Sequence, residues 1–469
     1  MKHHRRLSLS MLAWVLAAFS LGGSFPGEAK SPEKAGPAKT IKLDFKDLKL
    51  KNGLRVIVAE DHAAPVISLS ITYNVGSRNE RPGRTGFAHL FEHMMFKGSE
   101  NVGSGEHMVL VFNNGGSLNG TTSEDRTNYF EELPANQLDL ALFLEADRMR
   151  SLPSAITKEN LDNQRNAVQE ERRLGVDNQP YGKTSEKFQE TMFDNFGYKH
   201  SVIGSMEDLN AATVDDVKEF FRIYYAPNNA VLSLVGDFKT ADALAKIKKY
   251  FETIPSQTPP PAVDTSEPEQ KAERRFSLDD PLARLTRLNM GYKGITGNTP
   301  DYYAMRVFTQ ALASGQSSRL YQILVKEKEL VTSVFGYVQG VRGVGAFQIQ
   351  ADIAPGKKIE EVEQVIDAEI AKLQKDPIAD WELDKAKNSA RRAAIQSLQS
   401  TLGTALALGQ FAVFYNDPNL INTQFQKMAA VTKADVQRVA NKYLKTENRT
   451  VAHTIPKAKS PGAPTTMER

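Results

Sequence analysis

Two stretches of the chain resemble each other, and this internal repeat constrains the fold more than any other feature. VDDVKEFFRIYYAPNNAVL begins at residue 214, and KADVQRVANKYLKTENRTV begins at residue 433. Unrelated helix-to-strand junctions can share a few residues by chance, but matches at one constant offset favour a duplication. The repeat therefore predicts two similar halves. The matching pairs are Asp216 and Asp435, Val217 and Val436, Tyr224 and Tyr443, and Asn229 and Asn448.

A proline-rich segment divides the chain between the two repeats. Residues 254–275, IPSQTPPPAVDTSEPEQKAERR, are polar and lack periodicity, which is typical of a fairly extended linker. We therefore predict one globular half at residues 43–253 and a second at 276–456. Residues 30–42 and 457–469 are expected to be flexible. A content of 41% apolar and 25% charged residues excludes disorder over most of the length.

The N-terminus has the pattern of a secretory signal peptide. A basic start, MKHHRRLS, precedes MLAWVLAAFSL, which is too short to span a bilayer comfortably. Small residues follow, and we predict that residues 1–29 are removed by cleavage after Ala29; an uncleaved membrane anchor is the alternative. The chain contains no cysteine, and no later segment has 18 uninterrupted apolar residues. We expect an exported protein in the periplasm of a Gram-negative bacterium, without stable membrane insertion and without a nucleic-acid partner.

Strand and helix patterns alternate along the first half, which predicts an α+β fold. β-Branched residues predict strands in LRVIVAED, VISLSITYNVGS, TNYFEEL and NNAVLSLVGDF. In the second of these, apolar residues 67, 69 and 71 alternate with Ser and Thr, which is typical of a half-buried strand. Helical spacing predicts helices in GFAHLFEHMMF, LDLALFLEADRMRS and ITKENLDNQRNAVQEERRLG, the last ended by Gly175.

A pair of histidines in FAHLFEHMMFKGS, residues 87–99, is the candidate metal site. His89 and His93 are four residues apart, so one helix face can aim both imidazoles at one point. Zinc accepts such nitrogens at roughly 2.0–2.1 Å. Glu92 lies on nearly the same face and could take a proton from a metal-bound water. The alternative is an amphipathic helix that carries two histidines by chance.

A catalytic zinc ion needs a third protein ligand and one open position. The other histidines of the mature chain are scattered: His62, His107, His200 and His453. Better candidates are Glu170 and Glu171 in NAVQEE, on a predicted helix. Spacing alone leaves open whether these glutamates bind a metal or form a solvated face.

The motifs together resemble the pitrilysin-like zinc peptidases, also called inverzincins. GRTGFAHLFEHMMFKGS, GGSLNGTTSEDRTNYFEEL, NAVQEE and YAPNNAVLSLVGD occur in the family's order, and the resemblance covers residues 43–456. It is nearest to the short bacterial branch related to the mitochondrial processing peptidase beta subunit. The resemblance implies two α/β-roll halves and a zinc metalloendopeptidase. It also implies one zinc ion held by His89, His93 and Glu171, rather than Glu170, with Glu92 as the general base.

Two further segments acquire a meaning from this resemblance. The family binds its peptide substrate as an added β-strand, and SLNGTTS matches the contact segment. Asn119 and Gly120 would then meet the peptide backbone, although Asn-Gly by itself favours a plain turn. One turn before NAVQEE, the family often has a glutamate that supports the metal site. This chain has Gln164, which removes a charge behind the ligands and could weaken zinc binding.

The second half departs from the family pattern at its substrate clamp. Where the family often carries an arginine and, seven residues later, a tyrosine, this chain has Val325 and Thr332. Arg319 and Tyr321 belong to the preceding turn and do not replace that pair. We therefore expect a heterodimer with a similar subunit that lacks zinc and carries the clamp, the two enclosing peptides in a chamber. A homodimer is the alternative, and a non-catalytic scaffold or peptide-binding subunit is the second interpretation of function.

Overall fold

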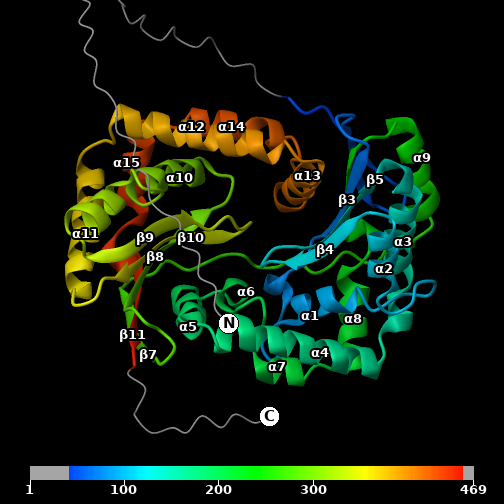
Figure 1. Cartoon of the computed structure of the whole chain (residues 1–469), viewed down its shortest axis with the longest axis horizontal. Coiled ribbons are helices and arrows are strands. Elements are labelled where there is room, and N and C mark those ends of the chain that lie inside the picture. The colour runs from blue at the N-terminus through cyan, green and yellow to red at the C-terminus, as the bar shows by residue number, and fades with distance from the viewer. Residues whose placement is uncertain (1–41, 458–469) are drawn as a thin grey trace, which may run out of the picture. The chain divides into compact units, whose positions relative to one another are not determined.

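The computed structural model describes residues 42–457, so the predicted signal peptide and the last twelve residues lie outside the described part. The first half contains a six-stranded sheet in the order β1-β2-β6-β3-β5-β4, of which β3, β4 and β5 are labelled in Figure 1. The β2–β6 pair is parallel, and the other neighbours are antiparallel. The strands are β1 (Lys46–Lys49), β2 (Arg55–Glu60), β3 (Val66–Tyr73), β4 (Ser117–Thr122), β5 (Thr127–Pro134) and β6 (Ala230–Gly236).

The second half contains a five-stranded sheet in the order β7-β11-β8-β10-β9, which repeats the first sheet without β1. Its one parallel pair, β7 with β11, corresponds to β2 with β6. The predicted α+β fold of two similar halves is therefore confirmed. The strands are β7 (Arg274–Asp280), β8 (Arg287–Thr296), β9 (Val331–Val338), β10 (Val344–Ile353) and β11 (Arg449–Pro456).

Fifteen helices surround these sheets in the described part of the chain. The first half contains α1 (Phe87–Met94), α2 (Glu106–Asn113), α3 (Leu138–Ser151), α4 (Lys158–Arg172), α5 (Gly182–Met192), α6 (Phe196–Lys199), α7 (Met206–Asn210), α8 (Val214–Tyr224) and α9 (Thr240–Phe251). The second half contains α10 (Pro300–Leu312), α11 (Ile359–Lys375), α12 (Asp380–Ser397), α13 (Thr401–Tyr415), α14 (Leu420–Ala429) and α15 (Lys433–Tyr443).

The repeated sequence stretches form α8 and α15, and both helices start in the same way. Thr213 and Asp216 form a capping box at α8, as Thr432 and Asp435 do at α15. Each helix is followed by an asparagine whose amide donates back to the carbonyl of its last tyrosine, over 2.8 Å in the first half and 2.9 Å in the second. The constant offset between the matching residues thus reflects the same helix-to-strand junction, present once in each half.

Strand β3 is buried on both faces, so the prediction of a half-buried strand is wrong. Its apolar side chains join the main core of the first half, and Ser68, Ser70 and Thr72 are also fully buried. Helix α13 of the second half covers these three polar side chains and packs against β3 and β6 (Figure 1). The alternation of apolar and polar residues therefore marks a face of small side chains that lets a helix approach closely.

The second sheet receives a helix from the first half in return. Phe188 and Met192 of α5 pack with Val341, Ala346 and Ala452 in one buried cluster. At Gly291 of β8, an added Cβ would lie 2.8 Å from the sulfur of Met192. Each sheet is therefore covered in part by a helix of the other half.

Two predicted boundaries differ from the structure. Gly175 does not end its helix, because the chain continues from α4 through a π-helical turn at Arg173–Asp177. The linker is shorter than predicted, since β7 begins at Arg274. It also packs against the second half, where the buried side chain of Gln270 donates to the carbonyl of Arg449 over 2.8 Å. Among residues 42–457, no helix has the length and apolar character needed to cross a membrane.

Candidate metal centre

A buried carboxylate fixes the start of α1, the helix that carries the histidine pair. The helix follows Gly86, which has a φ of 82° that few other residues tolerate. The backbone N–H groups of Gly86 and Ala88 donate to the two oxygens of Glu80 over 2.9 and 2.8 Å. His200 contacts the same carboxylate over 2.8 Å. Glu80 thus satisfies the free N–H groups of the helix end and places a negative charge at its positive pole.

The opposite faces of α1 have different roles. Leu90, Phe91 and Met94 are buried in the main core of the first half. His89 and His93 lie on the other side, where α1 packs against α4. Because α1 is anchored at its start and along its apolar face, both imidazoles have a fixed direction.

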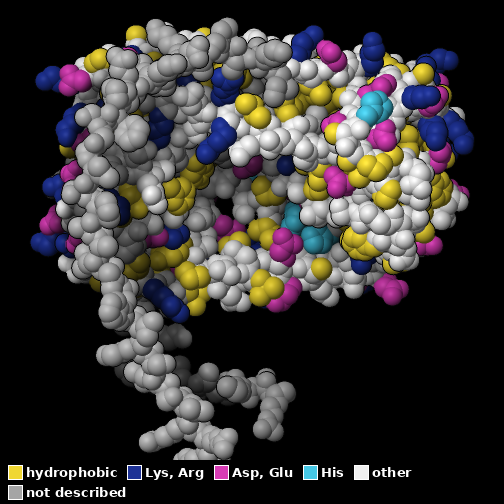
Figure 2. Space-filling view, turned by 45° about the horizontal axis from the view of Figure 1, so that its top comes forward, with side chains coloured by type: hydrophobic (Ala, Val, Ile, Leu, Met, Phe, Trp, Pro, Cys, Tyr) yellow, Lys and Arg dark blue, Asp and Glu magenta, His cyan; other side chains and the backbone are white. Residues whose placement is uncertain are grey.

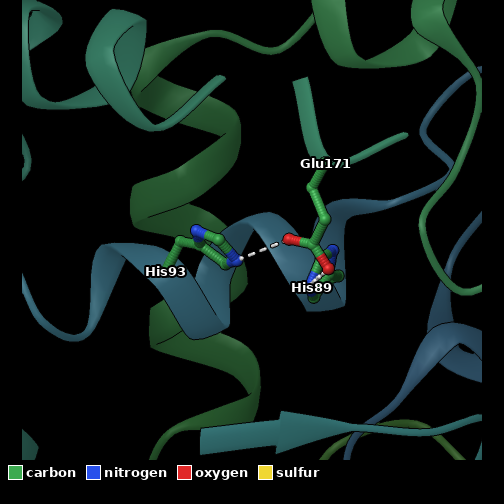
Figure 3. A group of neighbouring side chains, drawn as sticks. All are labelled: His89, His93 and Glu171. Atoms are coloured by element: carbon green, nitrogen blue, oxygen red, sulfur yellow. Dashed lines mark ion pairs between the residues drawn. The ribbon is translucent and has the colours of Figure 1, made fainter. Parts of the chain in front are cut away.

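Glu171 of α4 points between the two histidines (Figure 3). Its carboxylate oxygens lie 3.6 Å from Nε2 of His89 and 3.4 Å from Nε2 of His93. Two atoms bound to one tetrahedral zinc ion at roughly 2.0–2.2 Å are separated by about 3.3–3.5 Å. The three side chains therefore have the donor set of a zinc site, and the carboxylate lies at close to the spacing from each imidazole that a shared zinc ion requires.

The protonation states of these groups also suit a metal ion. Burial, followed by the neighbouring His93, lowers the pKa of His89 to about 4, so its imidazole is neutral at pH 7. The hydrogen bond with His93 lowers the pKa of Glu171, which is therefore ionised. A neutral imidazole and an ionised carboxylate both offer the free electron pairs that bind a cation.

Glu92, the predicted general base, lies beside these ligands and is held from strand β4. Its side chain is only 8% exposed, and burial raises the pKa of its carboxyl group. The Thr122 hydroxyl donates to Oε2 of Glu92 over 2.6 Å. Sequence reasoning did not identify Thr122. A strand assignment for residues 117–122 could have found it, because residues 120 and 122 then lie on the same face.

Asn119 and Gly120 lie inside β4, so the plain turn that Asn-Gly alone favours is wrong. Within residues 42–457, strand β4 pairs only with β5, which leaves its other edge free in this part of the chain. The Gly120 N–H donates to the side-chain oxygen of Asn119 over 2.9 Å. An added Cβ at Gly120 would lie 2.9 Å from Oε1 of Glu92, so any larger residue here would have to displace that side chain.

The remaining predicted positions are Gln164 in the first half and Val325 and Thr332 in the second. Gln164 of α4 is buried, and its amide donates to Asn163 over 2.5 Å. In the second half, Val325 lies in a π-helical turn at Tyr321–Glu327 and packs against that half's own core. Thr332 is exposed on β9 and donates to the carbonyl of Asp352 over 3.3 Å. Neither side chain can replace an arginine or a tyrosine.

Each histidine that looked scattered in the sequence contacts a carboxylate. The pairs are His62 with Asp237 at 2.6 Å, His107 with Glu131 at 3.7 Å, His200 with Glu80 at 2.8 Å, and His453 with Glu363 at 2.5 Å.

The pair of His107 and Glu131 belongs to a fully buried cluster that also contains Glu145. Glu145 already accepts two hydrogen bonds from Arg148, whose guanidinium supplies the local positive charge. This cluster therefore suits a second metal ion less well than the first.

Comparisons with known proteins agree with this geometry. Residues 55–205 match the family model described as insulinase, peptidase family M16, and residues 211–390 match the model described as the peptidase M16 inactive domain. A zinc protease, PqqE, of Helicobacter pylori is 31% identical over 455 residues, which is 96% of this chain and 99% of the relative. The chain belongs to peptidase family M16.

Two solved structures share the architecture, and a further relative is similar in sequence. The crystal structure of a protease from Helicobacter pylori has a TM-score of 0.84 at 31% identity, covering 89% of this chain and all of that chain. A peptidase M16 inactive domain from Pseudomonas fluorescens has a TM-score of 0.80 at 21% identity, covering 89% of this chain and all of that chain. A probable mitochondrial-processing peptidase beta subunit of Arabidopsis thaliana is 22% identical over 404 residues, or 84% of this chain and 75% of the relative.

Proposed function

We propose that this M16 protein is the catalytic subunit of a zinc-dependent endopeptidase, with one zinc ion held by His89, His93 and Glu171. The observation that carries the proposal is the convergence of these three side chains, whose ligand atoms all lie within 4.8 Å of one another. The name of the Helicobacter pylori relative, a zinc protease, supports the choice of metal. When bound, zinc would polarise the peptide carbonyl and acidify a water molecule.

Glu92 carries the proton in this mechanism. Its carboxylate accepts the proton of the attacking water and can return it to the leaving amine. Thr122 holds one carboxylate oxygen by its hydrogen bond, which leaves the other oxygen available for that transfer. Gly120 contributes by the absence of a side chain, because any Cβ there would displace Glu92.

The free edge of β4 is the proposed place of the peptide. An extended segment can pair with such an edge through backbone hydrogen bonds, which accept many sequences. Asn119 and Gly120 would contact its backbone next to Glu92. The space-filling view shows a hollow with histidine and acidic side chains at its edge, which gives a peptide access from solvent (Figure 2).

The partner and the location of the protein are part of this proposal. Val325 and Thr332 occupy the positions of the family's arginine and tyrosine, so we propose a second, similar subunit that supplies that pair and closes the chamber. The homodimer is the alternative. The N-terminal sequence MKHHRRLSLSMLAWVLAAFSL supports export to the periplasm.

A non-catalytic scaffold subunit is the second candidate, because part of this chain matches a model described as an inactive domain. That match covers residues 211–390, outside the candidate metal centre. The joint presence of four residues favours catalysis, since a scaffold has no need for all of them: His89, Glu92, His93 and Glu171.

The first test is peptide hydrolysis by the purified chain, with its zinc content, before and after addition of the protein encoded beside it. We expect bound zinc, and hydrolysis that a chelator abolishes and that increases with the partner. Zinc with strong hydrolysis by the chain alone would favour the homodimer. Zinc without hydrolysis in either state would favour the scaffold, and cleavage of esters but not peptides would contradict an endopeptidase.

A further inference from the structure

A pocket at the junction of the two halves contains more positive than negative charge. Its cavity of about 290 Å³ is lined by Asn74 and Arg78 of the first half, by linker residues 259–263, and by Arg342 of the second half. It therefore lies where three parts of the chain that are distant in sequence meet.

Asp125 is the carboxylate that pairs with Arg78, and its oxygens are already engaged. It forms an ion pair with Arg78 over 3.1 Å and accepts hydrogen bonds from the Tyr198 hydroxyl over 2.8 Å and the Arg342 backbone N–H over 2.6 Å. The Arg342 guanidinium has no ion pair among residues 42–457. Partial burial lowers the pKa of Arg342 and the nearby Arg78 lowers it further, whereas Asp125 raises it, so the two neighbours act on Arg342 in opposite directions.

The hydrogen-bonding groups of the pocket also favour an anion. The side-chain oxygen of Asn74 accepts from Arg78 over 2.9 Å and from Arg342 over 3.0 Å. The side-chain oxygen of Asn79, another lining residue, accepts from the Gly76 N–H over 3.1 Å. With these acceptors used, the N–H groups of both amides remain as free donors within residues 42–457.

Arg78 provides a separate indication of a missing partner. Its side chain is only 4% exposed, and its Nε atom is buried without a hydrogen-bond partner in the described part of the chain. A buried donor that stays unpaired costs about 1–3 kcal/mol. Oxygen atoms of a bound anion could accept charge-assisted hydrogen bonds from the two guanidiniums that line the pocket.

We propose that this pocket binds a small oxyanion of the phosphate class, held between Arg78 and Arg342 and by the amides of Asn74 and Asn79. Because Arg78 belongs to the first half and Arg342 to the second, the bound anion connects the two halves. The site is independent of zinc and of hydrolysis.

Calorimetric titration of the full chain with inorganic phosphate, against sodium chloride of equal ionic strength, tests the proposal. We expect saturable binding, and a Tm increase of about 1–3 °C at ten times the Kd. The Arg342→Gln variant keeps the backbone N–H that donates to Asp125. It should bind phosphate at least about 10-fold more weakly than the parent. The matched control is Arg392→Gln, at an exposed position of α12 outside the pocket, which should bind as the parent does.

A second variant guards against a local folding defect. Asn79→Asp keeps an acceptor for the Gly76 N–H but replaces a donor with a negative charge, so phosphate binding should disappear while the Tm without phosphate changes little. Absence of saturable phosphate binding in the parent would overturn the proposal. Equal binding by the parent and both pocket variants would overturn it as well.

Discussion

Gly120 and Glu92 are in such close contact that a side chain at position 120 would have to displace the Glu92 carboxylate. A Cβ at Gly120 would lie 2.9 Å from Oε1 and 3.0 Å from Cγ of Glu92. Strand β4, which offers its free edge to a peptide, therefore also sets the position of the proposed general base. Thr122 lies two residues after Gly120, on the same face of β4. Its hydroxyl donates to the other oxygen of that carboxylate.

Gly120→Ala should displace the Glu92 carboxylate while the three zinc ligands stay in place. We expect kcat for peptide hydrolysis to fall by about 10–100-fold, because a shift of this kind misplaces the proton acceptor. Zinc content should remain that of the parent. The matched control is Gly175→Ala, where an added Cβ meets no atom within 4 Å. Equal kcat in Gly120→Ala and the parent would contradict the assigned role of the contact.

Glu92→Gln should separate metal binding from chemistry. The amide keeps the shape of the side chain but cannot accept the proton of the attacking water, so kcat should fall by about 10²–10⁴-fold. Metal analysis should show unchanged zinc. Parental activity in this variant would exclude Glu92 as the general base.

Glu171→Gln and Glu170→Gln form a matched pair at adjacent positions of α4. Glu171 faces both histidines, whereas Glu170 pairs with Arg173 over 3.0 Å. Chelator competition should show that Glu171→Gln weakens zinc binding at least about 100-fold, since even outer partners of a metal site contribute 10–100-fold. Glu170→Gln should bind zinc normally. The reverse order would assign the third ligand to Glu170.

Glu131 should make the protein less stable as the pH rises. Burial raises the pKa of its carboxyl group from an ordinary 4.5 to about 8. Between these values the folded state holds a proton that the unfolded state has lost. The free energy of unfolding therefore decreases with pH, by up to about 1.4 kcal/mol per pH unit.

Urea denaturation of the metal-free protein between pH 5 and pH 8 measures this slope. Glu131→Gln, which cannot ionise, should flatten it. Glu159→Gln, at an exposed position of α4, should leave it unchanged. A slope that is the same in Glu131→Gln and the parent would show that another group is responsible.

Gly409→Ala tests the packing of α13 against the first sheet. An added Cβ would lie 2.5 Å from the hydroxyl oxygen of Thr72, which is buried and has no partner among the described residues. We expect a loss of about 1–3 kcal/mol in the free energy of unfolding from this overpacking.

Thr72→Ala should make room for the new methyl group. In that background, Gly409→Ala should stabilise the protein, because alanine favours a helix by about 1 kcal/mol over glycine. Denaturation of the parent, both single variants and the double variant gives the coupling between the two positions. Simple additivity of the two changes would contradict the contact.

The sequence by itself determined the local features of this protein. The spacing of His89 and His93 places both on one face of α1, because a helix turns every 3.6 residues. Strand alternation located β3, and the repeat at residues 214 and 433 revealed the two halves. These features follow from the backbone period and from residues close together in the chain.

Only the tertiary structure decided how distant segments meet. Packing of α4 against α1 brings Glu171 to the histidines, and pairing of β4 with β5 places Thr122 and Gly120 against Glu92. Packing of α13 from the second half buried the polar face of β3. No local period encodes these contacts, because they depend on how whole helices and sheets fit together. A sequence pattern therefore gives the face on which a residue lies, and the folded chain decides what that face contacts.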